Sequence, residues 1–449
     1  MIALTILVAV AALILLITVF RWHPVPALLL VTIGTGLALH MPILSPEGVF
    51  NAEGEPVLGI LDSMKKGIGG TLGDIAVLLG LGAMLGGVIA KAGATEVIAN
   101  SLVGKENNPQ RTIWLIGLAG FLVGIPLFYT VGFVMLVPII FAAASRTGLP
   151  LAMVGVATVA ALSVTHGFLP PHPAPVMLTE QFEADMGKVM LYGLLLAVPA
   201  VIIAGPLFAQ TLKGLHSSPP ELFQAPETTG KRPGLGLSIL MALSPVILIG
   251  GTRLIQALPF AWAKHPVVDL LANPNVALLI GLLLAMWLLG RATQRSIGAQ
   301  MQEVGEHLTP VANVLLIIAC GGALKQLLVE SGTADTIKTM VDSWQANPLL
   351  IGWSIAALAR IALGSATVAA ITAMGLAGGL ITPGVSPELM VLAIGAGSLT
   401  CSHVNDTGFW LFKSYFGLTV GQTFRSWTMM ETIVSLIGLG GVLLLAQWV

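Results

Sequence analysis

Long apolar runs recur along the whole chain, and they constrain its fold more than any other feature. Ile2 to Phe20, Leu191 to Ala209 and Ile433 to Val449 are examples. A helical run of about 20 apolar residues crosses a hydrocarbon core of roughly 30 Å. Only 9% of the 449 residues are Asp, Glu, Lys or Arg, against about 25% in an ordinary soluble domain. The sequence therefore predicts an all-α polytopic membrane protein. The first run is expected to be a retained span, because Arg21 follows it instead of a small-residue cleavage site.

Composition and motifs exclude several function classes. The net charge of -1 gives no argument for binding nucleic acid. Cys320 and Cys401 lie in apolar runs without metal-ligand spacing, so both are interpreted as packing residues. The sequence contains no His-Glu-x-x-His, no serine elbow and no phosphate-binding loop ending in Lys-Ser/Thr. We therefore expect that the protein is neither an enzyme nor an ATP-driven pump, and that it binds no metal and no cofactor.

Two apolar stretches differ from simple spans. Residues 112–145 and 348–382 are each too long for one span, too short for two spans with a loop, and interrupted near the middle. We predict re-entrant hairpins, whose non-helical tips are tolerated at membrane depth only where they are buried in protein or line a wet cavity. The remaining spans are expected at 2–20, 24–41, 72–90, 150–178, 188–212, 235–255, 276–290, 309–328, 387–414 and 428–449.

An internal repeat divides the chain into two halves, 1–213 and 234–449. A shift of 237 residues places Pro150 on Pro387 and His166 on His403, with Thr130 on Thr367 in the same register. The hydrophilic segment 214–233 between the halves is predicted to be a linker. Such repeats are typical of secondary transporters, in which discontinuous helices of both halves meet near the membrane midplane.

The distribution of basic residues indicates that the repeats are inverted. With the amino terminus outside and both hairpins re-entrant, more than half of the 20 lysines and arginines lie on or near the cytoplasmic side, as does the linker. The two hairpins then open from opposite sides, which is the geometry that alternating access requires.

Polar clusters interrupt one span in each half. Four prolines within residues 170–175 must break the span 150–178, because proline cannot continue a helix. For His172 a solute or proton role is favoured, whereas His166 could equally be a packing histidine bonded to a carbonyl. In the second half Ser402 and Asn405 share one helical face of the span 387–414, and a short aqueous loop is the alternative there.

The hairpin tips supply further hydroxyl groups. Gly364, Ser365 and Thr367 form the tip of the second hairpin, and Tyr129 and Thr130 belong to that of the first. Hydroxyls in membrane helices often bond back to their own helix. The repeat register nevertheless favours a site at both tips.

At these residues the sequence resembles the gluconate permease family. The segments 166–173, 361–370 and 402–413 are similar to its signature motifs, and the resemblance covers essentially the whole chain. It implies proton symport of gluconate and related sugar acids, with D-serine and other small hydroxy acids in some branches. It also implies a bacterial-type inner membrane, a homodimer, and a mobile hairpin-bearing domain that moves as an elevator against a fixed scaffold.

The resemblance and the residues together define the expected site. Helix N-termini can hold the carboxylate of the solute, and Arg360 is expected to form a structural ion pair. Many family members have an acidic residue where this chain has Thr130, so the proton is expected on Asp406, His403, His166 or His172, with Na+ left open as the coupling ion. The expected substrate-binding residues are Tyr129, Thr130, His172, Gly364, Ser365, Thr367, Ser402, Asn405 and Thr407. An anion channel remains the alternative class, and counterflow distinguishes it from a carrier.

Overall fold

The computed structural model describes most of the chain. The described residues are 2–50, 56–103, 108–125, 127, 129–170, 172–215, 217, 231–256, 265–306, 308–333, 346–377, 380–381 and 384–449. Within these ranges the structure is helical, and its sole β-type pairing is an isolated bridge between Phe50 and Pro56. The predicted all-α class is confirmed.

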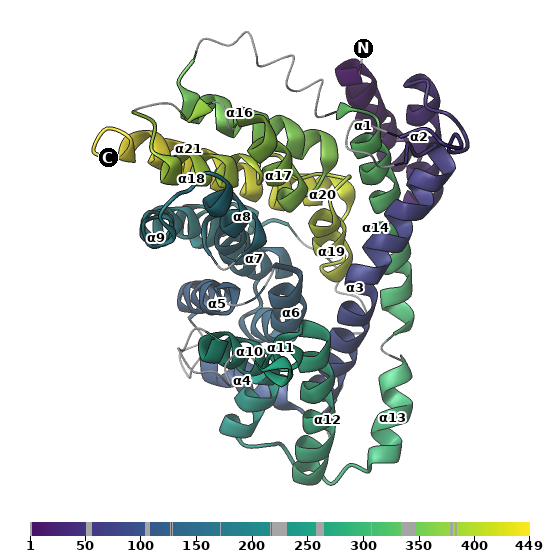
Figure 1. Cartoon of the computed structure of the whole chain (residues 1–449). Coiled ribbons are helices and arrows are strands. Elements are labelled where there is room, and N and C mark those ends of the chain that lie inside the picture. Colours follow the sequence, from purple (N-terminus) through teal and green to yellow (C-terminus); the bar gives the residue numbers. More distant parts are fainter. Residues whose placement is uncertain are drawn as a thin grey trace.

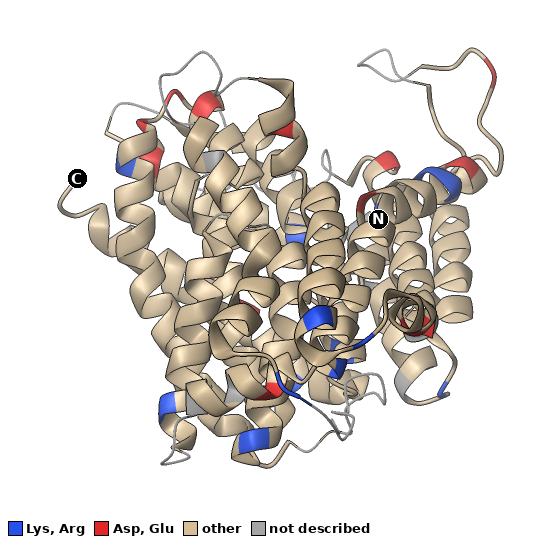
Figure 2. Ribbon diagram, turned by 90° about the horizontal axis from the view of Figure 1, so that it is seen from below, with Lys and Arg blue, Asp and Glu red and all other residues tan. Residues whose placement is uncertain are grey.

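Eight of the described helices are long and apolar enough to cross a membrane. Acidic and basic residues occur mostly near the ends of the helices and in the segments between them (Figure 2). The prediction of a polytopic membrane protein is therefore confirmed. The helices are α1 Ile2–Thr18, α2 Pro24–Ala38, α3 Ile60–Lys91, α4 Ala94–Val103, α5 Pro109–Gly124, α6 Tyr129–Thr147, α7 Leu151–Phe168, α8 Pro173–Gln181, α9 Met186–Ile202, α10 Leu235–Gln256, α11 Pro266–Ala272, α12 Pro274–Thr293, α13 Ile297–Glu306, α14 Thr309–Glu330, α16 Pro348–Leu363, α17 Ala366–Ala377, α18 Pro387–Gly397, α19 Thr407–Tyr415, α20 Val420–Thr423 and α21 Met429–Leu445, with short π or 3-10 turns at η1 Ile203–Leu207, η2 Gln210–Leu212 and η6 Phe424–Thr428.

Many of these helices begin at residues that favour a helix start, namely a capping side chain followed by proline. Proline occupies the first turn of α5, α16 and α18, where its missing N–H costs nothing. Asn108, Asn347 and Ser386 precede these prolines and accept a backbone N–H with their side-chain oxygens. The starts of the hairpins and of the second broken span are thus encoded locally.

Helix α3 is longer than the sequence indicates. It begins at Ile60 instead of residue 72, because its polar first turns pack against α14 instead of lipid. The two helices approach closely, since a Cβ on Gly67 would lie 2.3 Å from the carbonyl oxygen of Gly322. Lys66 pairs with Glu330 across the same contact at 3.1 Å. A segment with charges and glycines therefore continues the helix.

Both predicted hairpins form two helices joined by a short turn. α5 and α6 build the first and pack on α7, while α16 and α17 build the second and pack on α18. Each predicted broken span is interrupted, between α7 and α8 and between α18 and α19. The order hairpin, broken span and long helix thus recurs in the two halves. Pro126, Phe128, Pro171 and residues 218–230 of the linker lie outside the described residues, and the inverted orientation of the halves stays a prediction.

Two groups of elements face each other in space (Figure 1). α3 and α14 lie side by side, and α1 and α2 adjoin them. The hairpins, the broken spans and α21 form the other group. The contact between the groups positions the candidate site.

Candidate functional site

A cavity of about 380 Å³ lies where the hairpins and broken spans face α3 and α14. The wall formed by α3 and α14 includes Asp74 on α3 and Lys325 on α14, each the sole charged residue of a predicted span. The opposite wall comes from both halves of the chain. It is lined by Tyr129, Thr130, Val131, Ser163, His166, Pro173, Arg360, Gly364, Ser365, Ala366, Thr367, Leu399, Asn405, Asp406, Thr407, Gly408, Trp427 and Glu431.

Four helices begin at this cavity. The first residues of α6, α8, α17 and α19 all line it. The first backbone N–H groups of a helix have no intrahelical acceptor, and the helix dipole places partial positive charge there. Four converging N-termini therefore make the cavity favourable for an anion without a dedicated metal ion.

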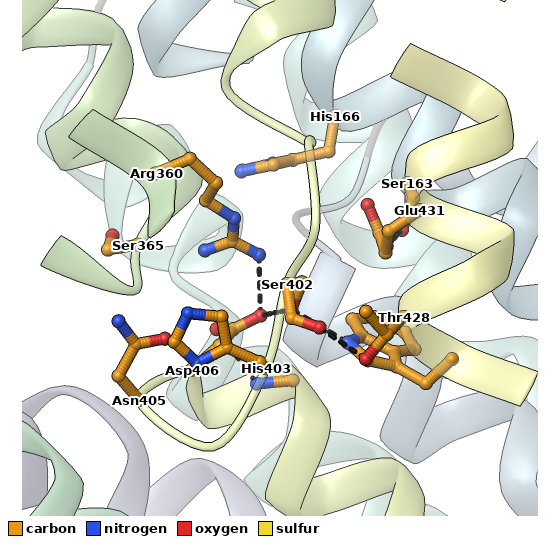
Figure 3. Close-up of polar contacts among 12 residues, drawn as sticks. Ser163, His166, Arg360, Ser365, Ser402, His403, Asn405, Asp406, Thr428 and Glu431 are labelled. Atoms are coloured by element: carbon orange, nitrogen blue, oxygen red, sulfur yellow. Dashed lines mark hydrogen bonds and ion pairs between the residues drawn. The ribbon is translucent and has the colours of Figure 1, made fainter. Parts of the chain in front are cut away.

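An ion pair is buried beside these helix starts. Arg360 Nη2 donates to Asp406 Oδ2 at 2.5 Å, and the arginine is only 3% exposed. Ser402 donates to the same oxygen, and Gly408 N donates to Asp406 Oδ1 at 3.1 Å. Trp427 Nε1 in turn donates to Ser402 at 2.7 Å. Figure 3 shows the contacts of Asp406 with Arg360 and Ser402, and the expected ion pair of Arg360 is confirmed.

Arg360 retains further donors. Its Nε and Nη1 groups are buried and have no hydrogen-bond partner among the described residues. Because buried polar groups are normally paired, these donors are suited to an anion that enters the cavity.

A second carboxylate lies in the cavity wall opposite Arg360 (Figure 3). Glu431 on α21 is 1% exposed, and its Oε1 accepts a hydrogen bond from Ser163 on α7. Neither residue is among the site residues that the sequence predicts. Glu431 is the sole charged residue of the predicted span 428–449, and that isolation was the available signal.

Three polar side chains of the broken spans cap the hairpins. His172 Nε2 donates to the carbonyl of Gly124 at 2.9 Å, at the end of α5. His403 Nε2 donates to the carbonyl of Ile361 at 3.0 Å, near the end of α16. Gly124 and Ile361 are equivalent under the 237-residue shift. A histidine thus satisfies the same helix-terminal carbonyl in each half.

Asn405 completes the cap of α16. Its Nδ2 donates to the carbonyl oxygens of Ile361 and Ala362 at 2.8 and 3.2 Å. Asn405→Ala is expected to lower the free energy of unfolding by about 1–3 kcal/mol, because a buried acceptor loses its donor. Thermal unfolding of the detergent-solubilised protein measures this. Asn275→Ala, at the start of α12, is the control and should stay within about 0.5 kcal/mol; equal unfolding temperatures for the two variants would contradict the capping role.

The structure brings most of the predicted site residues together. Tyr129, Thr130, His166, Gly364, Ser365, Thr367, Asn405, Asp406 and Thr407 line the cavity. His172, Ser402 and His403 do not line it; they are buried behind its wall and hydrogen-bond to protein groups. His166 Nε2 lies 3.5 Å from Thr367 Oγ1, which joins the two halves.

Comparison with known proteins places the chain among transporters. A protein-family model described as GntP family permease matches residues 1–449. The chain belongs to this family. It is 46% identical to a high-affinity gluconate transporter of Escherichia coli K12 over 98% of each chain. It is also 46% identical to the Gnt-II system L-idonate transporter of the same strain, over 87% of this chain and 90% of the relative. A gluconate permease of Pseudomonas aeruginosa is 41% identical over 98% and 96% of the two chains.

Membership of the GntP family confirms three predictions from the sequence. The resemblance to gluconate permeases holds over the full length, and the chain is a permease and not an enzyme. With eight helices able to cross a membrane, it is a multi-pass membrane protein. Its bacterial relatives fit a location in the bacterial inner membrane.

Proposed function

We propose that this permease imports gluconate or a closely related sugar acid by symport with a cation, the proton being the expected ion. The observation that carries the substrate class is the cavity, in which helix N-termini, unpaired arginine donors and hydroxyl groups meet. Relatives named for gluconate and for L-idonate are equally similar to this chain. Both names denote six-carbon hydroxy acids, so the common substrate has one carboxylate and several hydroxyls.

The carboxylate is assigned to the Arg360 side of the cavity. Nε and Nη1 of Arg360 are charged donors, and charge-assisted hydrogen bonds to carboxylates are the strong ones. The start of α17 at Ser365 to Thr367 adds backbone N–H groups nearby. The sugar hydroxyls then exchange water for Ser365, Thr367 and Thr407.

Movement is assigned to an elevator. The substrate contacts lie on the hairpins and broken spans, whereas α3 and α14 contribute the facing wall. We propose that the group of hairpins and broken spans carries the solute past α3 and α14, and that the group of α1, α2, α3 and α14 is a fixed scaffold that forms a homodimer. The two halves would supply the two gates if they run in opposite directions, as the charge pattern predicts.

Uptake into proteoliposomes tests the proposed substrate and the transport class together. We expect saturable uptake of labelled gluconate that unlabelled gluconate and L-idonate suppress, and we expect counterflow from preloaded vesicles. Counterflow requires an alternating site, so a channel would not show it. Uptake of D-serine or another small hydroxy acid in place of gluconate would overturn the sugar-acid assignment.

Thr367→Val tests the hydroxyl contacts. The variant keeps the shape of the side chain but removes a polar group from the cavity wall, so the KM for gluconate is expected to rise about 5–10-fold, the equivalent of one hydrogen bond. Thr432→Val is the control, since the Thr432 hydroxyl bonds back to Thr428 within α21 and lies outside the cavity lining. A KM that is the same in both variants would remove Thr367 from the binding site.

A further inference from the structure

The structure assigns the co-transported proton to Glu431. We propose that its carboxyl group, held by Ser163, binds the proton in the same cavity that takes the sugar acid. This inference rests on the proposed function and adds a residue outside the four proton candidates that the sequence indicates.

Burial without a countercharge is the first argument. Glu431 is 1% exposed and lies in the cavity wall. Its Oε1 accepts from Ser163, while its buried Oε2 has no hydrogen-bond partner among the described residues. Within the described part of the chain no lysine, arginine or histidine nitrogen lies within 4.0 Å of it, whereas Glu388, another largely buried glutamate, pairs with Lys188 at 3.9 Å. A carboxylate that is buried without a paired cation is favoured in its protonated form.

The charged groups around Glu431 are paired with each other, lie on the facing wall of the cavity, or lie outside the cavity. On the elements that pack against α21 and along the cavity wall, the titratable and charged groups are Asp74, Tyr129, His166, Lys188, Tyr192, Lys325, Arg360, Glu388, Cys401, His403, Asp406 and Arg425. Arg360 is the buried cation that shares the cavity with Glu431, and its Nη2 is bonded to Asp406, whereas Asp74 is exposed and Lys325 half-buried on the facing wall.

Asp406 differs from Glu431 in its surroundings. Its two oxygens accept from Arg360, Ser402 and the N–H of Gly408, so the carboxylate serves as the countercharge of Arg360 and as the N-cap of α19. His172 and His403 use Nε2 to cap helix-terminal carbonyls. Glu431 is thus the buried cavity-lining acid with an oxygen left for a proton, whereas Asp74 on the facing wall is exposed.

The charge balance in the cavity explains why the solute and the proton bind together. The charges of Arg360 and Asp406 cancel within their ion pair, and Lys325 and Asp74 on the facing wall contribute one positive and one negative charge, so the arriving solute adds one net negative charge. An ionised Glu431 in the same cavity would repel that charge, whereas a protonated Glu431 would not. Solute and proton therefore bind together: the proton enters from the outer water onto Oε2 and leaves to the cytoplasmic water after the solute does.

Glu431→Gln tests this assignment in proteoliposomes, because glutamine mimics the protonated acid permanently. In the wild type, the apparent affinity for gluconate should fall about tenfold per pH unit on the alkaline side of its profile, as expected for one linked proton. In the variant, exchange of labelled for unlabelled gluconate should persist within about threefold, with an affinity independent of pH. An imposed pH gradient should no longer drive accumulation, and a trapped pH dye should report no proton entry.

Two further variants keep the test decisive. Glu388→Gln removes a largely buried carboxylate outside the cavity lining and should retain full coupling. Ser163→Ala removes the hydroxyl that donates to Glu431 and should shift the pH midpoint of gluconate affinity upward, which tests the site even if Glu431→Gln does not fold.

The outcomes separate the inference from the function on which it rests. Absence of gluconate exchange in the wild type contradicts the proposed function itself. Proton-driven accumulation that persists in Glu431→Gln, an unshifted midpoint in Ser163→Ala, or wild-type uptake driven by Na+ and not by a pH gradient overturns the assignment of Glu431 alone.

Discussion

Arg360→Gln is expected to abolish gluconate uptake and to lower the free energy of unfolding by about 3–5 kcal/mol, because it leaves the Asp406 carboxylate buried without its partner. Thermal unfolding and uptake into proteoliposomes measure the two effects. Arg425→Gln is the matched control, since Arg425 lies exposed on η6; its stability should stay within about 0.5 kcal/mol of the wild type.

A double variant separates the two roles of Arg360. Arg360→Gln combined with Asp406→Asn removes both charges, so most of the lost stability should return. Uptake should remain absent, because the Nε and Nη1 donors assigned to the solute carboxylate are also lost. A double variant that transports gluconate at the wild-type rate would limit Arg360 to a structural role.

Gly364→Ala is expected to lower stability by about 3 kcal/mol or more and to eliminate uptake. Gly364 ends α16 with a φ of 70°, a left-handed conformation that costs about 1–2 kcal/mol for a residue with a Cβ. The added Cβ would also lie 2.3 Å from the backbone oxygen of Asn405, so the tip of the second hairpin would separate from the broken span. Thermal unfolding and uptake again provide the measurements.

Gly375→Ala is the control for that experiment. Gly375 lies within α17 of the same hairpin, and a Cβ there would meet no atom within 4 Å. Alanine in a helix is favoured over glycine by up to about 1 kcal/mol, so this variant should be as stable as the wild type or slightly more stable. Equal losses in the two glycine variants would show that the hairpin tip does not depend on this close approach.

Much of the fold follows from local sequence chemistry. The breaks at Leu169–His172 and at Ser398–Asp406 fall where prolines or consecutive polar residues interrupt an apolar run. The least accurate prediction was the start of α3. One face of its polar first turns packs against α14, and no local pattern in the sequence distinguishes such a helical segment from a loop.

The candidate site was only partly visible in the sequence. Ser365, Thr367 and Asn405 were predicted because they are polar residues that interrupt apolar segments, and Thr367 also coincides with Thr130 in the repeat. Glu431 and Ser163 were missed because each is a single polar residue in a regular helix. His172 and His403 were found, but the structure uses both to cap carbonyls behind the cavity wall.

The sequence alone determined that this chain is a helical membrane protein and that its helices break at defined points. Length of apolar run, proline and turn chemistry act between near neighbours, so they can be read without coordinates. Only the tertiary structure decided which polar groups meet: Ser163 with Glu431 across 268 residues, and Arg360 with Asp406 across 46. Such contacts depend on the angles at which helices cross. These angles are set by the packing of whole helix surfaces, which no local sequence pattern predicts.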